Sequence, residues 1–80
     1  MIYKGPQLST YWGDNQYSDR MAHVMKNEQG YYIEMYKGED LIETRPLYDH
    51  SEVYAESAAE NYVMGILNPW VIARFFLLQI

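Results

Sequence analysis

Apolar and polar residues alternate in the middle of the chain, and polar turns divide the alternation into short runs. In residues 31–36, Tyr31, Ile33 and Met35 occupy alternate positions, a period of two that is typical of a half-buried strand. Gly30 suits the positive φ of a tight loop, and Pro46 is expected to end a strand because it has no N–H to donate. The pattern predicts a three-stranded antiparallel meander over residues 21–47, with strands at 21–26, 31–36 and 41–45.

The charged residues of this meander predict which face of the sheet is buried. Glu34, Glu43 and Arg45 are expected to face water, with Arg45 in cross-strand reach of Glu34. The residues expected to pack against the core are Ile33, Met35, Ile42 and Thr44.

A helix is predicted over residues 49–67. Asp49 or Ser51 is the expected N-cap, and Asp49 with Glu52 resembles a capping box. Asn68-Pro69 is expected to end the helix. At about 100° per residue, one face of the helix is formed by Tyr54, Ala55, Ala58, Ala59, Tyr62 and Ile66.

The two ends of the chain have different compositions. Residues 1–20 contain turn-forming Gly5-Pro6 and Gly13-Asp14-Asn15, which predict an aromatic arm that covers one end of the core or docks on a neighbouring subunit. Nine of the eleven residues 70–80 are apolar, which favours a short helix or a strand. The expected fold class is therefore α+β, one domain over residues 1–80: a three-stranded meander, one helix on one face and an apolar C-terminal segment.

The composition limits the kinds of partner. The net charge is −5, and the six basic residues are spread along the chain without a run, so binding to nucleic acid is not expected. There are no cysteines, which favours a reducing compartment. The expected location is a cytoplasm rather than the secreted space. No apolar segment reaches the roughly 20 residues of a membrane span.

The chain shows no recognisable catalytic motif. Its two histidines, His23 and His50, stand outside any known motif, and His50 and Glu52 do not share a helix face. No zinc-type spacing and no glycine-rich phosphate loop is present. The sequence therefore predicts a protein that is not an enzyme and that holds no metal and no cofactor.

Two surfaces remain open to more than one interpretation. Glu52, Glu56 and Glu60 form an acidic helix stripe, which is either a solvated face or a docking face for a basic partner. Tyr32 and Tyr36 flank Glu34 on the outer sheet face, either as a contact surface or as a ladder that supports the sheet.

The apolar C-terminal segment is the strongest functional indication, because soluble monomers do not leave so much apolar surface in water. It is expected to fold back on the sheet, to pack on a second subunit or larger assembly, or to anchor at a membrane interface. The predicted partner-binding residues are Trp70, Ile72, Phe75, Phe76, Leu78, Tyr11, Trp12, Tyr32, Tyr36, Glu56 and Glu60.

Residues 30–67 resemble small proteins of tailed bacterial viruses, especially cyanophages. The resemblance is carried by Asp49-His50-Ser51, Tyr54-Ala55-Glu56, Ala59-Glu60-Asn61-Tyr62 and Gly65-Ile66-Leu67. It implies a viral origin, with the cytoplasm of a host cell or a virion as the location, and no particular activity. The order of meander and helix is also similar to AP2-like and integrase-arm DNA-binding domains, which use a basic sheet face where this chain has Glu34, Glu43 and tyrosines.

These observations lead to three hypotheses. The first is a non-enzymatic interaction protein that docks or assembles through its C-terminal segment and aromatic arm. The second is an acidic regulator or inhibitor of a host protein. The third is an AP2-like DNA-binding module.

Overall fold

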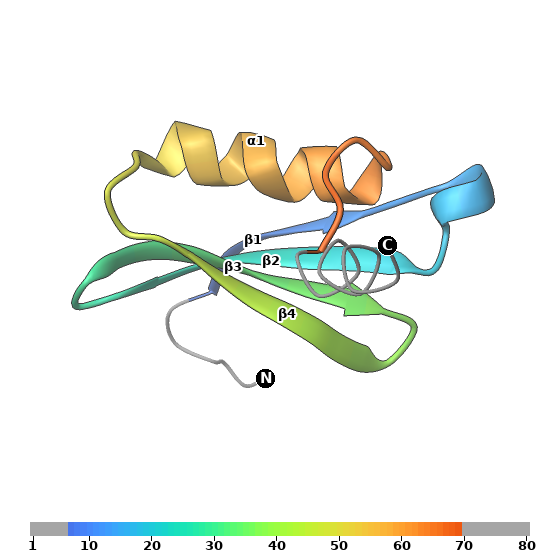
Figure 1. Cartoon of the computed structure of the whole chain (residues 1–80), viewed down its shortest axis with the longest axis horizontal. Coiled ribbons are helices and arrows are strands. Elements are labelled where there is room, and N and C mark those ends of the chain that lie inside the picture. Colours follow the sequence, from blue (N-terminus) through green and yellow to red (C-terminus); the bar gives the residue numbers. More distant parts are fainter. Residues whose placement is uncertain (1–6, 70–80) are drawn as a thin grey trace, which may run out of the picture.

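Four antiparallel strands form one sheet, and one α-helix packs on a face of it (Figure 1). The computed structural model describes residues 7–69. The predicted α+β class is confirmed, whereas the expectation of three strands is wrong, because the order in the sheet is β1-β2-β3-β4. The elements are β1 (Gln7–Trp12), the short 3-10 helix η1 (Asn15–Tyr17), β2 (Arg20–Asn27), β3 (Gly30–Lys37), β4 (Asp40–Leu47) and α1 (Glu52–Val63).

The additional strand, β1, comes from the segment that was expected to be an arm. It pairs antiparallel with β2, and Tyr11 lies opposite Ala22 while Trp12 lies opposite Met21. Threonine and aromatic residues favour a strand, but no clean alternation marks the segment because the register shifts between Gln7 and Ser9. An edge strand of this kind depends on its neighbour for its hydrogen bonds, which local sequence does not reveal.

The helix is shorter than predicted at both ends. Ser51 is the N-cap, and its Oγ accepts a hydrogen bond from the amide of Tyr54 at 3.2 Å, so the alternative cap Asp49 is not used. Ala55 and Ala59 are fully buried, and their small side chains allow α1 to approach the sheet closely. The predicted core positions Tyr54 and Ile66 are instead 49% and 66% exposed.

The core lies between α1 and strands β2 and β3. Tyr62 is its largest fully buried side chain, and the Tyr62 hydroxyl donates to the carbonyl of Tyr36 at 2.8 Å. This bond satisfies a polar group that would be costly to bury alone. The buried cluster consists of Ala22, Val24, Ile33, Met35, Leu47, Ala55, Ala59, Tyr62 and Val63.

The predicted orientation of β4 is wrong from Glu43 onward. A register shift lies where Met35 pairs with Glu43 while Tyr36 pairs with Leu41, so Ile42 is an extra residue. A bulge of this kind reverses the face of every later side chain. Ile42 still packs against the core as predicted, but Thr44 is exposed.

Arg45 therefore turns to the helix side of the sheet, where only 5% of it is exposed. Its Nε donates to Glu43 at 2.9 Å, and its Nη2 donates to the carbonyl of Asn68 at 3.2 Å. The expected outer pair of Arg45 with Glu34 does not form. Pro46 does not end the strand, because an edge strand tolerates a residue that lacks an N–H.

Arg20 binds the C-terminal end of α1. Its Nη1 donates to the carbonyl of Tyr62 at 2.8 Å, and its guanidinium lies 4.9 Å and 4.7 Å from the ring centres of Tyr17 and Tyr62. A cation is favourable at this end of a helix because the last carbonyls are unpaired. The predicted helix or strand over residues 70–80 lies outside the described residues.

Candidate interaction surface

The sheet has a second face, opposite α1, on which no described element lies (Figure 1). Alternation along the strands places one row of large side chains across this outer face. Trp12 pairs with Met21, Met21 with Tyr36, and Tyr36 with Leu41, so the row crosses all four strands. Trp12 is 69% exposed and Leu41 is 49% exposed. We call Trp12, Met21, Tyr36 and Leu41 the aromatic row.

A polar row runs beside the aromatic row. Thr10 pairs with His23, His23 with Glu34, and Glu34 with Thr44. Thr10 Oγ1 and His23 Nδ1 lie 2.8 Å apart, at hydrogen-bond distance. The His23 ring also meets the Tyr36 ring edge-on, with centroids 5.4 Å apart. The ring contact of His23 with Tyr36 joins the polar row to the aromatic row.

A third row, mainly apolar, completes the outer face. It contains Met25, Tyr32 and Pro46, which are cross-strand partners. The Tyr48 ring meets Tyr32 edge-on, with centroids 6.5 Å apart. Met25 is buried, whereas Pro46 is exposed. The outer face therefore consists of two mainly apolar rows with a polar row between them.

Charges are distributed unequally between the two faces of the sheet. The described lysines and arginines all occupy strand positions of the helix-side face: Arg20, Lys26, Lys37 and Arg45. The ionisable side chains at the described strand positions of the outer face are Glu34, His23 and the tyrosines Tyr32 and Tyr36. Burial, followed by the charge of Glu34, raises the pKa of both Tyr32 and Tyr36.

The predicted partner-binding residues are divided by the structure. Trp12 and Tyr36 are brought together in the aromatic row, and Tyr32 lies on the same face. Tyr11 lies on the opposite face, where its hydroxyl donates to Glu56. Glu60 is exposed on α1. The remaining predicted residues, which lie outside the described part of the chain, are Trp70, Ile72, Phe75, Phe76 and Leu78.

Glu56 does not belong to a freely solvated stripe. Its Oε2 accepts from Ser9 Oγ at 2.7 Å, while its Oε1 accepts from Tyr11. Both donors come from β1, so the carboxylate joins the helix to the edge of the sheet. The acidic side of α1 is thus partly a structural contact.

Sequence reasoning missed two members of the aromatic row, Met21 and Leu41. Met21 was placed in a strand, but it had no assigned face because β1 was not recognised as its neighbour. Leu41 precedes the bulge at Ile42 and pairs with Tyr36 on the outer face, a position to which the sequence interpretation gave no role. The available signal was the cluster of strand-favouring residues in 8–12, next to a predicted strand.

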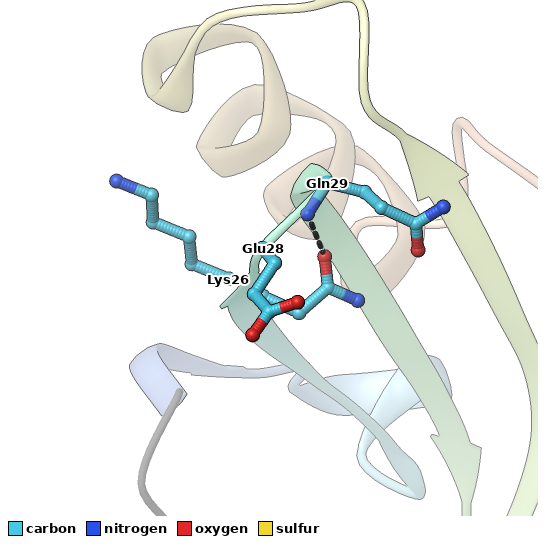
Figure 2. Close-up of a pocket in the computed structure, with 4 residues that line it drawn as sticks. Lys26, Glu28 and Gln29 are labelled. Atoms are coloured by element: carbon cyan, nitrogen blue, oxygen red, sulfur yellow. Dashed lines mark hydrogen bonds between the residues drawn. The ribbon is translucent and has the colours of Figure 1, made fainter.

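A surface hollow lies at the hairpin between β2 and β3, and Figure 2 shows its side chains pointing outward in different directions. The amide of Gln29 donates to Asn27 Oδ1 at 2.8 Å, which stabilises the turn. All four lining residues, Lys26, Asn27, Glu28 and Gln29, are exposed. The hollow therefore holds no converging groups that would bind a ligand.

Within residues 7–69, no group of three or more His, Asp or Glu side chains is placed to hold a metal ion. The helix found in that range is also too short and too polar to cross a membrane. No protein-family model, curated protein or solved structure matches this chain. A function is therefore inferred from the geometry of the outer face.

Proposed function

We propose that this chain is a non-enzymatic interaction protein that binds another protein through the outer face of its sheet. The observation that carries the proposal is the aromatic row, which presents Trp12 and Leu41 at 69% and 49% exposure. Tryptophan and tyrosine are enriched where proteins bind one another, because they bury a large area with little loss of side-chain entropy. The row also stands on a sheet, which holds its members in fixed positions.

The proposal differs in location from the expectation based on sequence. It retains Trp12, Tyr32 and Tyr36 as contact residues and removes Tyr11, which is engaged by Glu56. The C-terminal segment remains a second proposed contact, supported by its composition alone. A viral origin, with the chain acting in an assembly, is likewise a proposal supported only by the resemblance of residues 30–67.

The two alternative functions receive less support from the described residues. DNA binding through the sheet needs a cationic face, whereas the described strand positions of the outer face carry no lysine or arginine. Inhibition through the acidic helix stripe needs free carboxylates, whereas Glu56 accepts two hydrogen bonds from β1.

Paired surface variants test the proposed docking face. The row variant Trp12→Ser/Leu41→Ser removes apolar area from the outer face. The control variant Val53→Ser/Ile66→Ser removes apolar residues that are 75% and 66% exposed elsewhere. Self-association by sedimentation velocity and capture from a bacterial lysate are measured for both variants.

The expected result is that binding falls in the row variant and persists in the control variant. Equal binding by the two variants would contradict docking through this face. A truncated variant that lacks residues 70–80 tests the proposed C-terminal contact. An unchanged state of association and unchanged partners in this variant would contradict the C-terminal contact.

A further inference from the structure

Among the strand positions that the structure describes on the outer face, Glu34 is the one carboxylate, and it lies at the centre. It lies in β3 between Tyr32 and Tyr36, and its cross-strand partners are His23 and Thr44. The side chain is partly buried. A partly buried carboxylate has lost some of its contact with water, and it gains more from a nearby cation than a fully solvated one does.

No described lysine or arginine lies beside this carboxylate, and its cross-strand neighbour His23 has its Nδ1 2.8 Å from Thr10 Oγ1. The Tyr36 hydroxyl donates to Glu34 Oε1 at 3.4 Å, which is long for an O–H donor. Arg20 and Arg45 point to the other face, where they hold the carbonyls of Tyr62 and Asn68. Lys26 lies over the Tyr31 ring at 5.3 Å, and Lys37 pairs with Asp19 at 3.9 Å.

The tyrosines beside Glu34 add a second attraction for a cation. An arginine or lysine that reaches the carboxylate also comes near the rings of Tyr32 and Tyr36, whose faces attract positive charge. Arginine suits such a place because its planar guanidinium can meet a carboxylate and stack on an aromatic ring together. The apolar rows on both sides fit apolar side chains next to that cation.

We propose that the partner presents a basic group flanked by apolar side chains, and that this cation binds Glu34 while its neighbours cover the two apolar rows. This inference rests on the proposed docking function and specifies the chemistry of the partner. The contact residues are Glu34 for the cation and Trp12, Met21, Tyr32 and Leu41 for the apolar side chains.

The charge pattern favours this partner over a second copy of the chain. Two copies that met through their outer faces would bring two Glu34 carboxylates into one interface, and no described lysine or arginine lies on that face to separate them. Each copy also carries a net charge of −5, which opposes their approach. A nucleic acid is disfavoured as well, because its negatively charged phosphates would be repelled by the same carboxylate.

A pair of synthetic peptides tests the inference on the full chain. Both peptides have the sequence Gly-Leu-Leu-X-Leu-Leu-Gly, with X as arginine in one and as neutral citrulline in the other. Binding is followed by NMR amide shifts of the labelled protein at low salt. The expected result is shifts confined to the outer face and an affinity for the arginine peptide about tenfold higher.

Variants identify the acidic group that is responsible. Glu34→Gln should lower the affinity for the arginine peptide to that of the citrulline peptide. The control Glu39→Gln, in the exposed turn between β3 and β4, should leave the preference unchanged. If Glu34→Gln fails to fold, the comparison of the two peptides on the unaltered chain still tests whether the outer face prefers a cationic partner.

Each other outcome separates this inference from the proposed function. Equal affinity of the two peptides at the outer face, or a preference that persists in Glu34→Gln, overturns the cationic partner and leaves docking through the face intact. The inference is also overturned if 1 mM arginine peptide causes no amide shifts at the aromatic row, because the dissociation constant would then be weaker than about 1 mM. The row variant then tests the proposed function independently.

Discussion

The hydroxyl of Tyr11 in β1 donates a hydrogen bond to the carboxylate of Glu56 in α1, which joins the edge strand to the helix. Ser9, on the same side of β1, donates to the other oxygen of this carboxylate. One carboxylate thus satisfies two donors from a strand that has one neighbour, β2, among the strands of residues 7–69. The contact explains how β1 is held beneath α1 as well as against β2.

The stability of the fold should fall at alkaline pH because of this contact. The hydrogen bond to Glu56, with burial and the charge of the same carboxylate, raises the pKa of Tyr11 to about 12. Since the folded pKa lies above the value of about 10 for an unfolded tyrosine, the contribution of Tyr11 is complete below pH 10. It is lost as the pH rises towards 12.

The measurement is urea unfolding between pH 8 and 12 for the unaltered chain and Tyr11→Phe. The variant should lose less stability over this range. A residual slope is expected, because burial also raises the pKa of Tyr32, Tyr36 and Tyr62. Identical slopes for the two chains would contradict the assigned role of Tyr11.

Arg45 should be far more important for stability than an exposed basic residue. Arg45→Ala removes the guanidinium whose Nε lies 2.9 Å from Glu43 Oε2, and the Glu43 side chain is only 12% exposed. Loss of one member of a buried ion pair costs about 3–5 kcal/mol. The control Lys37→Ala breaks the exposed pair with Asp19 and should cost about 0–1 kcal/mol. Chemical unfolding measures both, and similar losses would contradict the prediction.

The helix N-terminus can be located by two alanine variants. Ser51→Ala removes the oxygen that accepts from the Tyr54 amide, and we expect a loss of about 1 kcal/mol. Asp49→Ala should change stability by less than about 0.5 kcal/mol, since Asp49 is an exposed residue before the cap. Thermal unfolding of both variants distinguishes the caps, and a larger loss in Asp49→Ala would reverse the assignment.

Gly65 should tolerate a side chain less well than Gly38, although both have a positive φ, +84° and +62°. A Cβ on Gly65 would lie 2.2 Å from the ring of Tyr17, whereas a Cβ on Gly38 meets nothing within 4 Å. Gly38→Ala should cost about 1 kcal/mol for its backbone conformation alone. Gly65→Ala should cost about 2–3 kcal/mol because Tyr17 must also move. Equal losses in unfolding experiments would show that the ring yields freely.

Much of the fold was predictable where the local pattern was strong. Alternation identified the strand that became β3, Gly30 has the positive φ expected at its turn, and the alanines identified the buried face of α1. The outer-face tyrosines Tyr32 and Tyr36 were also placed on the correct side. These features depend on neighbours within a few residues, so the sequence displays them directly.

The orientation of β4 was not predictable in the same way. A charged residue is normally assigned to water, yet Arg45 is buried because Glu43 and the carbonyl of Asn68 bind it there. The bulge at Ile42 that turns it inward depends on the pairing with β3. The carbonyl partner comes from a segment 23 residues later in the chain.

The sequence by itself determined the α+β class, the central hairpins and the alanine face of the helix, since short-range periodicity and turn chemistry specify these. Only the tertiary structure decided that residues 7–12 form a fourth strand, that Glu56 binds β1 and that Trp12, Met21, Tyr36 and Leu41 form one row. The physical reason is that strand pairing and bulges join residues far apart in the chain, and a shift of one residue moves a side chain to the other face.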